Sequence, residues 1–388
     1  MSRSALITLA AAAGTLSLGA LATNFGLFTP GAVAQARPAD SPPPALLESP
    51  KAADVVDAAD AFLATLSVEQ RAIAQIELKP SLAVRWTNFP GGSNVRNGVF
   101  YRDLKPAQVE AALKVARVAL GEVGFARYQE VRAADDAFAK GTGRGPGGPG
   151  GPPQKKADDP AKKKAGDPAK KKGGGPGGGF NFGSANYMIA FLGKPSGVSP
   201  WILQLGGHHL AINIYYKGTT GAATPYHVAA QPTVWKDDQG KTHDPLAPMR
   251  DSLHGLLLSL TPEQAKLAKL DARFNDVYVG PGKDGKFPAQ SEGVPASGLS
   301  DASKDFLKKA IAAWTGDSPQ GLEYRKLYEA DLDKVKVSYS GTTNVGDRGD
   351  YVRIDGPRVW IEFATQGSDH YHTIWRDRQT DYGAEFSF

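Results

Sequence analysis

Histidines are the residues best suited to chemistry in this chain, and four of the seven lie in two short clusters. His208 and His209 follow a glycine pair in the middle of the chain, and His370 and His372 flank a tyrosine near its end. Because side chains alternate along a strand, a His-x-His pair directs both imidazoles to one face. Such a pair typically offers two metal ligands or two proton carriers at one point. The alternative is a set of hydrogen-bonded histidines with a structural role.

Strand alternation groups further polar side chains with these histidines. The predicted strands that carry these residues each have an apolar face and a polar face, and the polar faces carry the candidates. These candidates are His209, Asn213, Arg353, Glu362, His370, His372 and Arg376. His208 alternates with apolar residues instead, so we favour His209 over His208 as a partner of the C-terminal pair.

The ligand types in the chain restrict which metal it could bind. Two histidines with a third histidine or a carboxylate can hold a catalytic metal that keeps one position open. The chain contains no cysteine, which removes thiolate ligands and favours a divalent ion such as Zn²⁺, with copper as an alternative. We therefore predict one divalent ion on His370, His372 and either His208 or His209.

A carboxylate and two arginines on the same faces make a metal-dependent hydrolase the leading hypothesis. Glu362 would be the fourth ligand or the general base. Arg353 and Arg376 would orient a small-molecule substrate that carries a carbonyl or a negative charge. A non-catalytic metal-binding protein is the alternative, and a redox copper protein is a third hypothesis.

Aromatic residues of the same strands suggest a different binding function. Tryptophan and tyrosine rings bind sugars by stacking, so exposed rings here would form the floor of a glycan-binding groove. The rings concerned are Tyr215, Trp360, Tyr371 and Trp375.

Other motifs carry less information. Residues 341–350 are rich in glycine and aspartate but lack calcium-loop spacing, and residues 280–286 lack the hydroxyl residue and helix of a phosphate loop. The absence of a Gly-x-Ser-x-Gly motif disfavours a common α/β-hydrolase. The three remaining histidines stand alone, so we expect structural roles for His227, His243 and His254.

The elements that must position these residues are helices and strands in alternating groups. Helix-start patterns occur at 66–70, 104–108, 260–264 and 299–303. The first two patterns are about 38 residues apart, and so are the last two. This spacing is compatible with a duplicated helical unit, although convergent capping is the simpler explanation. Strand-like runs cover 186–192, 201–205, 208–216, 335–339, 351–354, 358–364 and 371–375. The pattern predicts an α+β fold with a largely antiparallel sheet flanked by amphipathic helices.

The N-terminal 34 residues have the pattern of a secretory signal peptide. A basic residue precedes a long apolar run, and Ala32-Val33-Ala34 gives a cleavage pattern before Gln35. A membrane anchor is the alternative, and no later run approaches the roughly 20 apolar residues that span a bilayer. We therefore expect a periplasmic or extracellular protein with no transmembrane segment after cleavage, and a flexible lead-in over residues 35–50.

The net charge of +5 is concentrated in one low-complexity segment, residues 141–179. This segment contains nine basic and three acidic residues, a balance of +6, so the rest of the chain is at about −1. A nucleic-acid-binding function is therefore poorly supported. We expect a disordered insertion in a single α+β domain of residues 51–388. Its lysines between Lys155 and Lys172 would allow a weak contact with a polyanion, although a tolerated loop expansion is the simpler interpretation.

Three stretches of sequence together resemble one protein family. They are residues 201–213, residues 352–363 and the C-terminal run of His370-Tyr371-His372, Arg376-Asp377 and Asp381-Tyr382-Gly383. On these residues the chain resembles a family of exported bacterial proteins known as domain of unknown function 3500. The resemblance covers about residues 55–385, except for the lysine-rich insertion. It implies no activity, but it supports treating the two histidine clusters as one site.

Overall fold

The computed structural model describes residues 35–36, 45–91, 94–142 and 182–388. The predicted signal peptide, and the predicted insertion from residue 143 onward with Lys155–Lys172, lie outside the described residues. Two parts of the predicted lead-in are strands. Gln35–Ala36 (β1) pairs with Phe386–Ser387 (β17), and Leu47–Glu48 (β2) pairs with Thr220–Ala222 (β8). The described part of the lead-in is therefore tied to the domain by backbone hydrogen bonds.

One large sheet dominates the fold, which confirms the predicted α+β class. In the described residues it contains 13 strands, and the order along its main path is β12-β13-β14-β15-β16-β9-β7-β6-β5-β3. All pairs on this path are antiparallel except the short pair of β3 and β5. The bounds are β3 Gln75–Ile76, β4 Val99–Phe100, β5 Met188–Leu192, β6 Trp201–Gly207, β7 Leu210–Lys217, β9 Tyr226–Ala230, β12 Val294–Pro295, β13 Lys336–Ser340, β14 Tyr351–Asp355, β15 Val359–Gly367 and β16 His370–Asp377.

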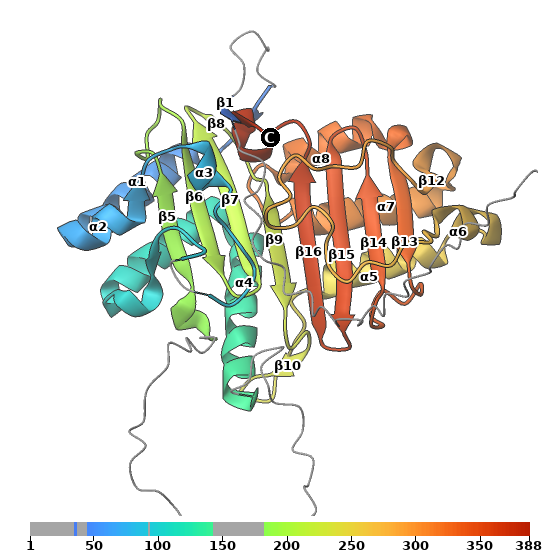
Figure 1. The fold of residues 1–388 in the computed structure, drawn as a ribbon, viewed down its shortest axis with the longest axis horizontal. Coiled ribbons are helices and arrows are strands. Elements are labelled where there is room, and N and C mark those ends of the chain that lie inside the picture. Colours follow the sequence, from blue (N-terminus) through green and yellow to red (C-terminus); the bar gives the residue numbers. More distant parts are fainter. Residues whose placement is uncertain (1–34, 37–44, 92–93, 143–181) are drawn as a thin grey trace, which may run out of the picture.

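Five longer helices cover the apolar face of this sheet, behind it in the view of Figure 1. They are α1 Ala52–Ala64, α4 Pro106–Thr142, α5 Ala247–Leu258, α7 Asp301–Thr315 and α8 Gly321–Ala330. Their buried side chains pack against the apolar side chains on one face of the sheet and form the main core with them. These strand residues include Leu203, Ile212, Ile361 and Phe363. Fully burying one such side chain contributes roughly 1.5–3 kcal/mol, so this layer is the main source of stability.

Two shorter helices begin at the predicted capping boxes. Ser67 caps α2 (Val68–Ala74) and Thr261 caps α6 (Pro262–Ala268), each with the reciprocal glutamine bond. The other two predicted starts also agree with the structure, because α4 begins at Pro106 and α7 is capped by Ser300. The helix starts were therefore correctly predicted by local capping chemistry.

The two halves of the chain repeat one arrangement of elements. In the first half, β5 pairs with β3 in parallel and with β4 in antiparallel orientation. In the second half, β13 pairs with Lys269 in parallel and with β12 in antiparallel orientation. In the first half, the Gln70 side chain donates a 2.8 Å hydrogen bond to the carbonyl of Asp103. In the second half, Gln264 donates to the carbonyl of Gly298 at the same 2.8 Å distance. These shared long-range contacts favour duplication over convergent capping.

Irregular segments, rather than long helices, cover the polar face of the sheet. Residues 84–91, 94–98 and 269–293 cross this face, in front of the sheet in Figure 1, together with the short helix α3 (Pro80–Ala83). They enclose a second, smaller core that includes Trp86, Val277 and Ile374. Both faces of the sheet are therefore covered, and the polar strand residues lie beneath these segments.

Candidate metal centre

The central strands of the sheet bring the two histidine clusters together. β9 lies between β7 and β16, and its residue Ala229 is directly opposite His372. On its other side, the Ala229 amide donates a 2.8 Å bond to the carbonyl of His209. Because Ala229 has only a methyl side chain, imidazoles from both neighbouring strands can meet above it. His370, on the same face of β16, completes the group.

A tight turn positions His209. The β6–β7 hairpin turns at His208 and His209, and His209 has a positive φ of 64°. A residue with a side chain pays about 1–2 kcal/mol for this conformation. The His209 amide donates a 2.9 Å bond to the carbonyl of Asn88 in the covering segment. Gly207 is needed just before the turn, since a Cβ there would lie 2.5 Å from the Tyr187 ring.

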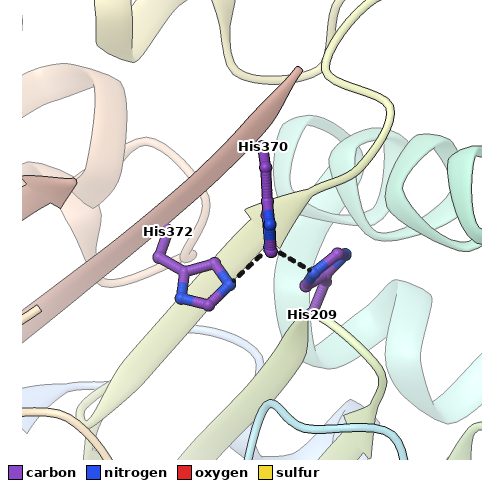
Figure 2. A group of neighbouring side chains, drawn as sticks. All are labelled: His209, His370 and His372. Atoms are coloured by element: carbon purple, nitrogen blue, oxygen red, sulfur yellow. Dashed lines mark hydrogen bonds between the residues drawn. The ribbon is translucent and has the colours of Figure 1, made fainter. Parts of the chain in front are cut away.

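The three imidazoles point their Nε2 atoms at one another (Figure 2). The Nε2 atom of His370 lies 2.9 Å from that of His209 and 2.9 Å from that of His372. A ring nitrogen carries either one proton or one lone pair, so the His370 nitrogen cannot make two full hydrogen bonds. A single cation, in contrast, would accept the lone pairs of all three. The three ligand atoms lie within 4.8 Å of one another, so this group could hold a metal ion.

The surroundings favour the neutral form of His209 and His370. His209 and His372 are each 2 % exposed, and His370 is 9 % exposed. Burial, with a contribution from His372, lowers the pKa of His370 to about 3. Burial and the neighbouring histidines also lower the pKa of His209 well below its ordinary value. Neutral imidazole is the form that binds metals, so the site is ready for a cation at neutral pH.

A carboxylate that the sequence did not reveal fixes the orientation of His372. Oδ1 of Asp276 lies 2.7 Å from Nδ1 of His372. An Nδ1–H that donates to a carboxylate leaves Nε2 unprotonated, as in many metal sites. Burial opposes ionisation of Asp276, but His372, His227 and the backbone amide of Val277 together outweigh it and lower the pKa of the carboxyl. Asp276 lies in an irregular segment without a motif, so no local pattern identified it.

Glu362 shares the face of the histidines but is already fully engaged. Its carboxylate accepts hydrogen bonds from the backbone amides of Tyr278 and Val279, the Trp360 indole and the Tyr351 hydroxyl. Burial raises the pKa of Glu362, and these four hydrogen bonds oppose that effect. It does not belong to the group of converging ligand atoms. Its contacts are those of an anchor for the segment that carries Asp276.

The two predicted substrate-orienting arginines are also paired within the chain. Arg376 is fully buried and contacts the carboxylates of Asp284 at 3.0 Å and Asp381 at 2.9 Å. Arg353 is 1 % exposed and contacts Glu292 at 3.1 Å. Asp284 and Glu292 both belong to the covering segment 269–293. The arginines therefore hold this segment on the sheet in the same way as Glu362 does.

His208, the alternative third ligand, points away from the group. Its Nδ1 atom lies 2.6 Å from Oδ1 of Asp135 on α4, and its ring stacks on His209 with centroids 3.6 Å apart. It is absent from the converging set of ligand atoms. His209 is the histidine that joins His370 and His372, which is the preferred candidate, but His208 and His209 lie in the turn between β6 and β7 and not, as predicted, on a strand that begins at residue 208.

Of the three isolated histidines, His227 lies beside the site. It is on β9, two residues before Ala229, and its ring centroid is 5.6 Å from that of His372. It is fully buried, and neither ring nitrogen has a hydrogen-bond partner among the described residues. Burial lowers the pKa of His227 to about 3, so the ring is neutral. The sequence offered no signal for this placement, because His227 has no nearby histidine along the chain.

The aromatic rings proposed for sugar stacking are inaccessible, which contradicts the predicted glycan-binding groove. Trp360 and Trp375 are fully buried, and Tyr215 and Tyr371 are 1 % and 5 % exposed. The Trp375 indole donates a 3.1 Å bond to the hydroxyl of Tyr328 inside the core. A sugar cannot stack on a ring that other side chains cover, so these aromatics have packing roles.

The fold and site define an α+β protein with a buried triad of histidines between two related halves of one sheet. Residues 48–384 match the family model described as Protein of unknown function (DUF3500), and the chain belongs to this family. No curated protein and no solved structure matches the chain. The family match agrees closely with the expected range of 55–385. Among the helices that the structure describes, none has the length and apolar character to cross a membrane.

Proposed function

We propose that His209, His370 and His372 bind one divalent metal ion and that the protein is a metal-dependent hydrolase. The observation that carries this proposal is the convergence of three buried Nε2 atoms that cannot all satisfy one another by hydrogen bonds. Zn²⁺ suits three imidazole ligands best, and copper is the alternative. Three protein ligands leave one position open, and a bound ion would supply a Lewis acid that activates water or a substrate carbonyl.

The residues around the triad have supporting roles in this proposal. Asp276 holds the proton on Nδ1 of His372 and so keeps Nε2 free for the ion. The Asp276 side chain is 34 % exposed, far more than any of the three histidines, so substrate would enter on its side. Export through the predicted signal peptide is part of the same proposal. N-terminal sequencing of the mature protein tests it, with Gln35 as the expected first residue.

Metal analysis of protein purified without a His-tag tests the triad directly. We expect about one Zn²⁺ per chain in the wild type and none in the double variant His370→Ala, His372→Ala. His254→Ala is the matched control, because this histidine on α5 contacts the carbonyl of Thr343 and does not belong to the triad. It should retain the full stoichiometry. A wild-type protein that takes up no metal at neutral pH would show that the proposal is wrong.

A non-catalytic metal-binding protein is the second candidate, and the burial of the site supports it. With His209 and His372 each 2 % exposed, a bound ion would be nearly closed to solvent. Cobalt substitution distinguishes the two candidates, because the visible spectrum of Co²⁺ reports its ligands. A spectrum that changes with small added ligands indicates an open position and favours the hydrolase. A spectrum that no added ligand changes favours the binding protein.

A further inference from the structure

We infer that the substrate of this site carries an aromatic or similarly flat apolar group, which Phe89 and Tyr278 contact. This inference rests on the proposed metal site and extends it to a substrate class. Both residues are large, apolar and accessible, with Phe89 59 % exposed and Tyr278 47 % exposed. Contiguous exposed apolar surface marks ligand-binding and interaction sites, so the placement of these two residues relative to the histidines decides the argument.

Both aromatic residues belong to the segments that touch the histidine triad. The side-chain amide of Asn88 lies 3.3 Å from Nδ1 of His372, and Phe89 is the next residue. The Asp276 carboxylate lies 2.7 Å from the same nitrogen, and Tyr278 follows two residues later. The two covering segments therefore meet over His372, and each bears an exposed aromatic residue within two positions of its contact.

Buried charged residues hold the backbone of both aromatic residues. The Arg96 guanidinium, 3 % exposed, donates to the carbonyl of Phe89 itself and to the carbonyls of Thr87 and Gly207. On the other segment, the fully buried Glu362 accepts a hydrogen bond from the amide of Tyr278. The two rings are therefore exposed on segments whose backbone is held in place, as expected for a preformed binding surface.

Aromatic contacts also fix the ring of Tyr278. It meets Phe274 edge to face, with centroids 6.3 Å apart and an interplanar angle of 83°. Phe274 in turn stacks on the buried ring of Tyr351 with centroids 4.0 Å apart. Since Arg353 and Arg376 are neutralised by carboxylates, these two cations do not attract an anionic substrate. The surroundings therefore suit a neutral, flat apolar group beside the part of the substrate that binds the ion.

Two hydroxamates that share one metal-binding head test this inference. Acetohydroxamate ends in a methyl group, and benzohydroxamate ends in a phenyl ring. Their affinities for the Co²⁺-loaded full chain are measured from the visible spectrum. We expect benzohydroxamate to bind about tenfold more tightly, the gain typical of a buried aromatic contact. In Phe89→Ser and Tyr278→Ser this preference should fall to less than about threefold, with acetohydroxamate affinity unchanged. Leu322→Ser, which removes an exposed apolar residue on α8, is the matched control and should keep the preference.

The possible results separate the inference from the proposal on which it depends. Equal binding of both hydroxamates to the wild type, or a preference that survives both serine variants, overturns the aromatic contact and leaves the metal site intact. Bound Co²⁺ that responds to neither hydroxamate overturns both the open position and the substrate class. Far-UV circular dichroism confirms that the variants are folded, which is expected because each substitution is at an exposed position.

Discussion

At the scale of single residues, the contact between Asp276 and His372 is the one most directly tied to metal binding. Replacement of Asp276 by asparagine keeps the shape of the side chain but removes the charge that holds the Nδ1 proton. We expect metal affinity to fall by about 10- to 100-fold with little change in stability. Chelator competition measures the affinity. Asp369→Asn removes a nearby exposed carboxylate and is the control. Equal affinity in wild type and Asp276→Asn would contradict the role of this carboxylate.

The lowered pKa values of His209 and His370 predict a pH dependence of stability in metal-free protein. The pKa of His370 is about 3 in the folded chain, whereas an unfolded histidine titrates near pH 6.5. Between these values the unfolded chain binds a proton that the folded chain does not. Stability is therefore fully present above about pH 6.5 and decreases as the pH falls toward 3.

Urea unfolding at pH 7 and pH 5 in the presence of a chelator measures this effect. Wild-type protein should lose more stability between the two pH values than His370→Gln, which cannot titrate at this position. An equal loss in both proteins would show that His370 is not held in its neutral form.

At the scale of elements, the segment of residues 269–293 depends on buried charges for its position. Glu362→Gln replaces an acceptor of four hydrogen bonds with a group that is partly a donor, so some of its partners lose their bonds. We expect a loss of roughly 1–3 kcal/mol in the free energy of unfolding. Because the same segment carries Asp276, metal affinity should fall as well.

Two measurements on Glu362→Gln distinguish an anchor from a ligand. Urea unfolding of the metal-free protein gives the stability, and chelator competition gives the affinity. A positioning role predicts that both decrease, in contrast to Asp276→Asn, in which affinity alone decreases. Lost metal binding with unchanged stability would instead indicate that Glu362 acts on the ion directly.

At the scale of the whole molecule, the site depends on both halves of the duplicated arrangement. The first half contributes the hairpin that carries His209, and the second half contributes His370 and His372 on β16. β9 joins the halves through its pairs with β7 and β16. The equivalent hairpin of the second half, between β14 and β15, carries no histidine. The duplicated framework thus forms one triad at its junction.

The lysine-rich segment should be dispensable for this framework. The chain on its two sides is already joined, since the rings of Phe138 and Phe182 lie 5.1 Å apart and the Gly183 amide donates to Asp135. Replacing residues 143–181 with about ten glycine and serine residues should therefore leave the melting temperature nearly unchanged. Calorimetry of the shortened chain is the measurement, and a loss of more than a few degrees would contradict this expectation.

The sequence by itself determined the features that depend on local periodicity. Capping residues predicted where α2, α4, α6 and α7 begin, and alternation predicted that His370 and His372 share a face. These predictions agree with the structure because each depends on residues within one turn or one strand. The α+β class followed from the order of such segments.

Only the tertiary structure decided what the polar face of the sheet contacts. Alternation shows that Trp360 and Arg353 share a face, but not that an irregular segment covers it and leaves both buried. Likewise, no local pattern predicts that β9 places Ala229 between His209 and His372, or that Asp276 reaches His372. Strand order and loop docking arise from contacts between residues far apart in the chain, which carry no local sequence signal. For that reason the sequence identified the histidines, and the fold determined which of them meet.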